Sequence, residues 1–439
     1  MSTVHTASRA RAAVAAAQAA TRWRSAPSAA RRQRLRDRAA ARRAAALLAL
    51  LAVLAALTPP ALAASRAAGP RRAGAGPAGA EPASADQAGS GSARGAAPAA
   101  DQTAASAGRP SLFGVAATSA GNAWAVGDIG TGQLRTLILH WNGRSWRRVP
   151  SPSPAPGNDS LSAVAASSAA SGWAVGGRGG KPLILHWNGR AWLTARAPQP
   201  AGGGVLAGVA AISASDAWAV GFGGRRDNTT LIDHWNGHAW RQVASPKLAG
   251  GGNLDAVTAT SASNAWAVGF GGTAGRPLTE HWNGRSWRTV RSPGPAGAGL
   301  IGLAATSARN AWAVSGIAGH EIGTNHSQIL HWNGRAWRRV HSADPAPGGA
   351  ILLGAAATSA SSAWAVGVDT DFVTSFETVI EHWNGKTWRL QHSAVRDGDL
   401  NAVAAVSASN AWAVGATAAN QALIEHWNGR SWRRSAPGV

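Results

Sequence analysis

Residues 254–290 read LDAVTATSASNAWAVGFGGTAGRPLTEHWNGRSWRTV, and closely related stretches occur seven times between residues 111 and 439. The first tryptophan of the copies recurs about every 48 residues, at Trp124, Trp173, Trp218, Trp266, Trp312, Trp364 and Trp412. A period of roughly 40–50 residues with strand-like patterning is typical of the blades of a β-propeller. The repeat therefore predicts seven blades.

Each copy contains four short strand candidates, which in the quoted stretch are Leu254–Thr260, Ala265–Gly269, Leu278–Trp282 and Ser286–Val290. Side chains alternate between the two faces of a strand, so Trp266 and Val268 point to one side and two alanines to the other. Because both faces of a blade are buried in a ring, the large residues of one blade should meet small residues of the next. We expect an all-β fold, a seven-bladed β-propeller of four-stranded blades.

An Asn-Gly pair separates the third and fourth strand candidates of every copy. The asparagines are Asn142, Asn188, Asn236, Asn283, Asn333, Asn384 and Asn428. Asn-Gly is a strong hairpin signal, because both residues of such a turn adopt positive φ. We therefore expect a tight hairpin with positive φ at both positions in each blade.

In this pattern the chain resembles the Asp-box (BNR-type) β-propellers, and among them the photosystem II assembly-factor-like propellers; kelch blades have a similar shape. In the second copy the resemblance lies in Leu161, Val164, the run Trp173–Gly176 and the hairpin Asn188–Trp192. It implies a propeller over residues 111–439. The aspartate of the box is replaced by a tryptophan in every copy: Trp141, Trp187, Trp235, Trp282, Trp332, Trp383 and Trp427. The resemblance therefore implies the fold and carries over no specific function.

The expected blades cover residues 111–160, 161–205, 206–253, 254–299, 300–351, 352–399 and 400–439. Each blade is continuous in sequence, so we expect the ring to close by packing of the first blade against the seventh without an exchanged strand.

The N-terminal segment has the composition of an export signal. Residues 1–43 contain eleven arginines, and an apolar run over residues 44–57 precedes a small-residue cleavage motif. We predict a signal peptide over residues 1–63, cleaved after Ala63, or an uncleaved anchor in which residues 44–64 tether the protein to a membrane. Residues 64–110, rich in Ala, Gly, Pro and Ser, are predicted to be a disordered linker. The protein is then secreted or extracytoplasmic, and its Arg- and Ala-rich composition is typical of an actinobacterium.

Connections between strands two and three, and between consecutive blades, vary between copies, and variable loops on a rigid scaffold commonly carry function. The candidate ligand-binding residues there are Arg225, Arg226, Asp227, His320, Glu321, His326, Asp369, Asp371, Phe372, Phe376 and Glu377. The first three form a candidate anion contact. The His and carboxylate groups of the fifth and sixth copies are either solvated loop residues, which we favour, or metal ligands.

A histidine precedes the third-strand tryptophan in every copy, at His140, His186, His234, His281, His331, His382 and His426. One histidine per blade lies on a ring rather than in one cluster, so a structural role beside the tryptophan is favoured over metal binding. The tryptophans are interpreted as inter-blade core rather than sugar platforms. Arginines also recur in the hairpin and on the fourth strand, where they either protect a free strand edge or form a cationic rim for cell-wall polyanions or anionic lipids.

The chain has 439 residues, no Cys, no Tyr and a formal net charge of +22. Disulfides, metal–thiolate sites, thiol nucleophiles and the tyrosine nucleophile of sialidases are therefore excluded, and no cofactor or metal site is predicted. No organised catalytic constellation stands out, and an exported protein is not expected to bind nucleic acid. We favour a non-catalytic binding module for a protein or glycan at the bacterial cell surface. The alternatives are a glycan-active or metal-dependent enzyme that uses the variable loops, and a membrane-tethered assembly scaffold; the oligomeric state stays open.

Overall fold

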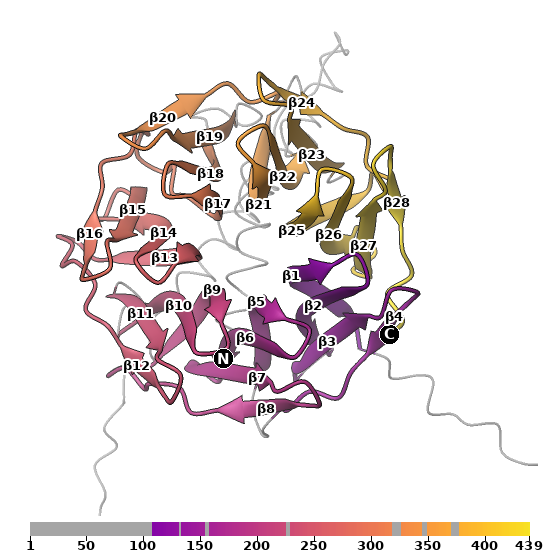
Figure 1. Ribbon diagram of the computed structural model, residues 1–439, viewed down its shortest axis with the longest axis horizontal. Helices are drawn as coiled ribbons and strands as arrows, with labels where there is room; N and C mark the ends of the chain where they lie inside the picture. The colour runs from indigo at the N-terminus through magenta and orange to yellow at the C-terminus, as the bar shows by residue number, and fades with distance from the viewer. Residues whose placement is uncertain are drawn as a thin grey trace, which may run out of the picture. The chain divides into compact units, whose positions relative to one another are not determined.

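The computed structural model describes residues 108–130, 133–153, 158–224, 229–317, 326–344, 349–369 and 377–439. These residues form seven four-stranded sheets arranged as a ring around a common axis (Figure 1). The prediction of an all-β, seven-bladed propeller with four-stranded blades is confirmed. The predicted signal peptide, and the predicted linker up to residue 107, lie outside the described residues. None of the described residues belongs to a helix that could cross a membrane.

The strands of the first four blades have the following bounds. Blade one comprises β1 (Pro110–Ser119), β2 (Asn122–Ile129), β3 (Arg135–Trp141) and β4 (Trp146–Arg148). Blade two comprises β5 (Asp159–Ser168), β6 (Ser171–Arg178), β7 (Lys181–Trp187) and β8 (Trp192–Ala195). Blade three comprises β9 (Gly204–Ser213), β10 (Asp216–Gly223), β11 (Thr229–Trp235) and β12 (Trp240–Gln242). Blade four comprises β13 (Gly252–Ser261), β14 (Asn264–Gly271), β15 (Arg276–Trp282) and β16 (Trp287–Thr289).

The last three blades repeat the same order. Blade five comprises β17 (Gly302–Ser307), β18 (Asn310–Ile317), β19 (His326–Trp332) and β20 (Trp337–Val340). Blade six comprises β21 (Ala350–Ser359), β22 (Ser362–Asp369), β23 (Glu377–Trp383) and β24 (Trp388–Leu390). Blade seven comprises β25 (Gly398–Ser407), β26 (Asn410–Thr417), β27 (Ala422–Trp427) and β28 (Trp432–Arg434).

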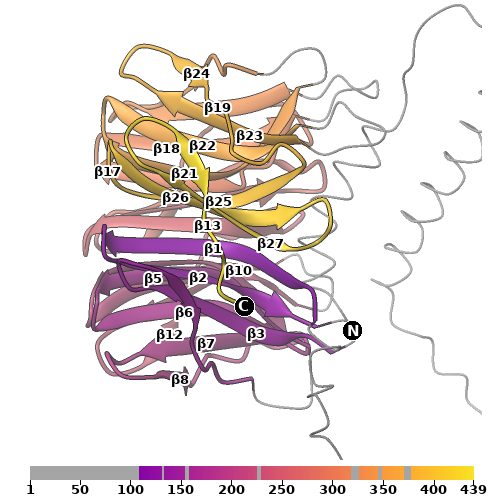
Figure 2. The same cartoon turned by 90° about the vertical axis from the view of Figure 1, so that its right-hand side faces the viewer.

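Within each blade, neighbouring strands are antiparallel and follow sequence order from the axis to the outside. The uniform turns between strands one and two and between strands three and four therefore gather at one end of the ring, which we call the hairpin face. The variable connections between strands two and three, and from one blade to the next, gather at the opposite end, which we call the connection face (Figure 2).

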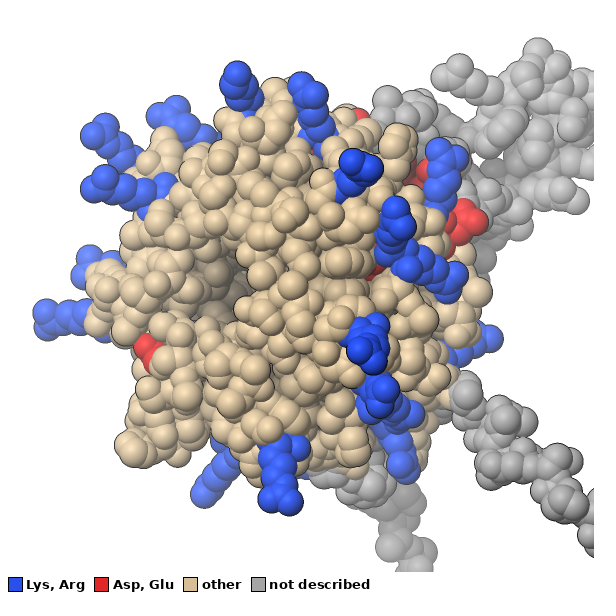
Figure 3. Space-filling view, turned by 45° about the vertical axis from the view of Figure 1, so that its right-hand side comes forward, with Lys and Arg blue, Asp and Glu red and all other residues tan. Residues whose placement is uncertain are grey.

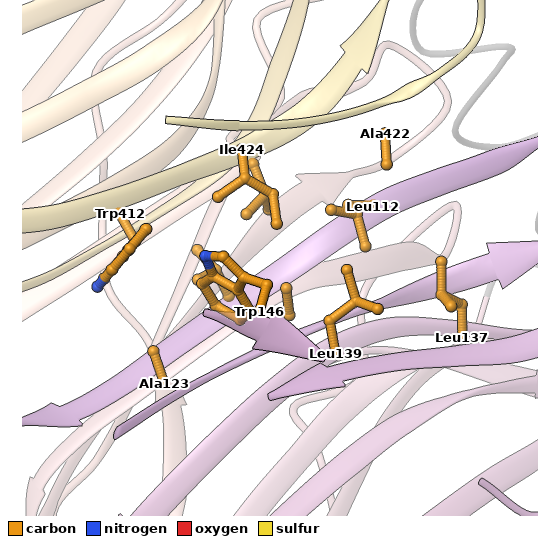
Figure 4. Close-up of a cluster of buried hydrophobic side chains, with 11 residues drawn as sticks. Leu112, Ala123, Leu137, Leu139, Trp146, Trp412, Ala422 and Ile424 are labelled. Carbon is orange, nitrogen blue, oxygen red and sulfur yellow. The ribbon is translucent and has the colours of Figure 1, made fainter. Parts of the chain in front are cut away.

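The ring closes without an exchanged strand, since every sheet consists of four strands that are consecutive in sequence. Blade seven contributes Trp412 and Ile424 to a buried cluster with Leu112, Leu139 and Trp146 of blade one (Figure 4). The amide Nδ2 of Asn401 also donates a hydrogen bond to the carbonyl oxygen of Leu112, at 3.0 Å. Hydrophobic packing and this side-chain hydrogen bond thus join the two ends of the ring.

The glycine that ends the A-W-A-V-G motif allows the innermost strand to approach the second strand closely. A Cβ atom on Gly127 would lie 1.8 Å from the carbonyl oxygen of Ser111. Blade five has Ser315 at this position, and there the innermost strand begins only at Gly302. In blade five the innermost strand therefore does not make the close approach that excludes a side chain at this position in the other blades.

The hairpin between strands three and four differs from the expected turn. In blade one, Trp141 pairs with Trp146, so four residues form the loop. Gly143 has a φ of 88°, but Asn142 does not adopt positive φ. Its Oδ1 instead accepts hydrogen bonds from the backbone N–H groups of Arg144 and Ser145, both at 3.0 Å. The prediction of positive φ at both residues was wrong, because the asparagine acts through its side chain.

The hairpin asparagine and the residue two positions later should differ in their effect on stability. Asn188 Oδ1 accepts two backbone hydrogen bonds, whereas Arg190 contributes only its backbone N–H. Replacing Asn188 with Ala should lower the free energy of unfolding by about 1–2 kcal/mol, and replacing Arg190 with Ala should leave it unchanged. Urea unfolding of the two variants measures this difference; equal destabilisation would contradict this role of the asparagine.

Candidate functional site

The tryptophan of the second strand forms the contact between blades. Trp124 is 1% exposed and stacks on His140 of its own blade, with ring centroids 4.1 Å apart. It also meets two tryptophans of blade two, Trp187 at 4.8 Å and Trp192 edge-to-face at 5.2 Å. All seven second-strand tryptophans are at most 1% exposed. These rings are enclosed and cannot stack on a sugar.

The histidine beneath each of these tryptophans is held in the same structural unit. In blade one, His140 Nε2 lies 2.8 Å from Asn122 Oδ1. Burial lowers the pKa of His140, His186, His281, His331, His382 and His426. Each of these rings is therefore favoured in its neutral form and lies in a separate blade. Within the described ranges, no group of three or more His, Asp or Glu side chains is placed to hold a metal ion.

A buried carboxylate lies two residues before the third-strand tryptophan in four blades, and a leucine in the other three. These residues are Asp233, Glu280, Glu381 and Glu425, against Leu139, Leu185 and Leu330. All seven side chains are at most 3% exposed. The glutamates accept hydrogen bonds from a serine of the preceding blade, such as Ser342 Oγ at 2.6 Å from Glu381 and Ser393 Oγ at 2.7 Å from Glu425. The three glutamates therefore connect neighbouring blades and are buried away from the surface.

Asp233 has no such partner. The corresponding position of blade two is Ala197, and no described residue donates a hydrogen bond to the Asp233 carboxylate. Burial raises the pKa of Asp233 to about 7. Burial likewise raises the pKa of Glu280 to about 7, although Ser245 Oγ donates to it at 3.1 Å. Burial therefore favours the protonated form of both groups below a pH of about 7.

The raised pKa values of Asp233 and Glu280 predict that these two residues lower the free energy of unfolding as the pH rises from about 4 to about 7. Between the ordinary carboxyl pKa near 4 and the native value near 7, the folded state holds protons that the unfolded state has lost. Asp233→Leu, which introduces the residue found in three other blades, should therefore raise the midpoint of urea unfolding, and more at pH 8 than at pH 5. Because the histidines are common to both proteins, the difference between wild type and variant isolates Asp233. An equal or lower midpoint in the variant at pH 8 would contradict the assignment.

Several of the predicted loop residues lie outside the described residues: Arg225, Arg226, Asp227, His320, Glu321, Asp371, Phe372 and Phe376. The anion and metal hypotheses that rest on them stay predictions. The other three lie at the connection face, His326 at the start of β19, Asp369 at the end of β22 and Glu377 at the start of β23. Asp369 and Glu377 are partners in the strand register of blade six.

His326 pairs with a residue that the pattern did not indicate. Its Nδ1 lies 3.3 Å from Asp344 Oδ2. Asp344 Oδ1 also accepts hydrogen bonds from Ser327 Oγ at 2.7 Å and from the backbone N–H of Ala350 at 3.1 Å. The aspartate thus anchors the connection between blades five and six. No sequence signal marks Asp344, since its partners are set by the fold.

Two grooves open at equivalent places on the connection face, between the start of the third strand and the segment after the fourth. The groove in blade two has a volume of about 250 Å³, and Arg178, Thr194, Arg196 and Gln199 contribute to its lining. The groove in blade three has a volume of about 620 Å³, and its lining includes Lys247. Neither groove was predicted, because each is formed by segments that meet only in the folded blade.

A second candidate surface lies on the hairpin face. The third residue of each hairpin loop is basic or histidine: Arg144, Arg190, His238, Arg285, Arg335, Lys386 and Arg430. We call these seven residues the hairpin cation ring. All are exposed, and no arginine or lysine of the described residues forms an ion pair with a carboxylate.

In contrast to these exposed cations, many of the carboxylates are buried. Eight of those in the described residues are buried: Asp128, Asp159, Asp233, Asp255, Glu280, Asp369, Glu381 and Glu425. Lys and Arg therefore outnumber carboxylates among the exposed charged side chains. On the face shown in Figure 3 they project around the ring, and few carboxylates are visible. Residues 111–439 carry 26 basic and 16 acidic side chains, so the exposed surface is more cationic than their difference of 10 indicates.

The architecture defines the class of the chain, a seven-bladed β-propeller, and several solved structures are similar to it in fold. No protein-family model and no curated protein matches the sequence. A GH74 xyloglucanase from Xanthomonas campestris is 18% identical, with a TM-score of 0.55 over 76% of this chain and 55% of that one. The present chain therefore spans about half of the xyloglucanase chain, and the likeness shows the propeller fold alone.

Two further solved structures are similar in fold at a lower score. The BP39L lectin from Burkholderia pseudomallei is 15% identical, with a TM-score of 0.49 over 75% of this chain and 99% of that one. The structure of YCF48 bound to D1 peptide is 15% identical, with a TM-score of 0.43 over 64% of this chain and 82% of that one. Neither likeness assigns a ligand to this chain.

Proposed function

We propose that this chain is an exported, non-catalytic binding propeller whose hairpin cation ring holds an anionic glycan of the bacterial cell surface. The proposal rests on the third residue of the hairpin loop. This residue is a cation or histidine in every blade, although only its backbone N–H takes part in the turn. In blade one, the N–H of Arg144 donates to Asn142 Oδ1, and no described residue binds the guanidinium group. Any residue would complete this turn.

The seven repeats allow structural recurrence to be separated from functional recurrence. The hairpin asparagine recurs because its Oδ1 caps the loop, and the glycine recurs because its φ is near 90°. The third loop residue has no such role, yet it is Arg in five blades, Lys in one and His in one. We interpret this recurrence as selection for positive charge on the surface.

A ring of cations suits a polymer with regularly spaced negative charges. Each exposed contact contributes little alone, but a chain that reaches several blades binds through all of them at once. The burial of most carboxylates removes competing negative charge from the surface and raises the positive potential that attracts a polyanion. The proposal includes export by the N-terminal segment, which places the protein where such polymers occur, and an Asp-box or kelch-like origin of the blades.

The hairpin cations should contribute more to polymer binding than cations elsewhere. We expect the propeller to bind polygalacturonate, with a dissociation constant that rises as salt is added, and not to bind neutral dextran. The triple variant Arg144→Gln, Arg285→Gln and Arg430→Gln should bind about threefold or more weakly, since each exposed contact is worth about 0.2–1 kcal/mol. Binding is measured by titration at low and high salt.

The matched control removes the same charge from the connection face through Arg135→Gln, Arg276→Gln and Arg396→Gln. These three arginines are exposed and lie outside the hairpins, so this variant should bind almost as wild type does. Equal weakening in both triple variants would show that only net charge matters. Salt-resistant binding, or no binding, would overturn the proposed polyanion partner.

A further inference from the structure

We infer that the groove of blade two is a binding site for a single sugar ring that carries an anionic group, a carboxylate or a phosphate. The groove lies on the connection face, between the start of β7 and the segment that follows β8. It is therefore separate from the hairpin cation ring, which lies at the other end of the molecule.

Two guanidinium groups line the groove and have no hydrogen-bond or ion-pair partner among the described residues. Arg178 ends β6, and Arg196 follows β8. Neither side chain forms a hydrogen bond or an ion pair within the part of the chain that the structure describes. A third cation, Lys181, is the strand partner of Arg178 across the Gly179–Gly180 turn. Arginine binds carboxylate and phosphate groups in a bidentate manner, so these side chains favour an anionic ligand.

One carboxylate lies close to these cations and is already engaged. Asp159 is the strand partner of Arg178 on β5 and is fully buried. Its Oδ2 accepts a hydrogen bond from Ser153 Oγ at 3.0 Å, and burial raises its pKa despite the charge of Arg178. Asp159 does not line the groove, so the groove keeps a positive balance.

The rest of the lining matches the other features of a sugar ring. Pro182, Leu183 and Ile184 form buried apolar walls, Ala195 is partly exposed, and Thr194 and Gln199 supply a hydroxyl and an amide. Such a combination, mostly apolar with a few polar groups, is characteristic of small-ligand sites. A volume of about 250 Å³ is below the roughly 300–1,000 Å³ of sites for drug-sized molecules, and it fits one sugar unit rather than a longer segment.

The equivalent groove of blade three provides an internal comparison. It is larger, about 620 Å³, and among the described residues its lining contains one lysine, Lys247, and no arginine. The positions that correspond to Arg178 and Arg196 are Gly223 and Ala244 in blade three. We do not expect the blade-three groove to compensate when the arginines of blade two are removed.

The inference rests on the proposed function, since an acidic sugar is the repeating unit of an anionic glycan. Separate experiments test the two, so one can be contradicted while the other stands. The groove is tested with small sugars, and the hairpin ring is tested with polymer. The probes are glucuronate, glucose 1-phosphate, glucose and inorganic phosphate, titrated into the full chain by calorimetry. We expect saturable binding of one or both acidic sugars, and at least tenfold weaker binding of glucose and of inorganic phosphate.

Variants of the two arginines then locate the site. Arg178→Gln and Arg196→Gln should each weaken binding of the acidic sugar about tenfold or more, and Arg196→Lys, which keeps the charge but not the bidentate geometry, should weaken it less than Arg196→Gln does. Arg276→Gln, on the same face but outside the groove, should have no effect, and all variants should keep the wild-type melting temperature. Unaltered binding in both glutamine variants, glucose binding as well as the acidic sugars, or no saturable binding of any probe would overturn the inference. Equal affinity for inorganic phosphate would reduce the site to a bare anion site and overturn its assignment to sugars.

Discussion

The contact of one tryptophan with two tryptophans of the next blade holds this molecule together. The chain has no cysteine, and its ring is not closed by an exchanged strand. What joins blade seven to blade one is the same contact that joins every other pair, here Trp412 against Trp141 at 4.8 Å and Trp146 at 5.1 Å. Edge-to-face aromatic pairs contribute about 0.5–1.5 kcal/mol beyond their burial. Seven equal interfaces therefore supply the closure.

This contact also explains the composition of the blades. The indole N–H groups of the second-strand and fourth-strand tryptophans have no hydrogen-bond acceptor within the described residues, since they lie among rings rather than oxygens. Only the third-strand tryptophans reach one, such as Trp141 Nε1 donating to the carbonyl oxygen of Ala120 at 3.0 Å. Beside these large rings, the same core contains small residues on the facing side of the next blade. Ala123, for example, lies in one buried cluster with Trp412.

Blade number, strand order and the position of each hairpin were predictable because they depend on local patterns repeated seven times. The conformation of the hairpin asparagine was not, since a four-residue loop and a two-residue turn begin with the same Asn-Gly pair. The bonds from Ser342 to Glu381 and from His326 to Asp344 join residues 39 and 18 positions apart. Only packing brings them together. The grooves were missed for the same reason, and the candidate residues of the longest loops are still predictions.

In our proposals the hairpin face binds an anionic polymer and the connection face binds a single acidic sugar. The three lysines of the chain are divided between these two faces, so chemical modification of the lysines can distinguish them. Lys386 belongs to the hairpin cation ring, whereas Lys181 and Lys247 lie on the connection face, and the chain has no other lysine. The most direct test is zero-length carbodiimide cross-linking of bound polygalacturonate, with the modified lysines identified by mass spectrometry. If the hairpin cation ring holds the polymer, Lys386 will carry the polymer. An unmodified Lys386, with adducts at Lys181 and Lys247 alone, would show that the polymer binds at the other face and would contradict the account.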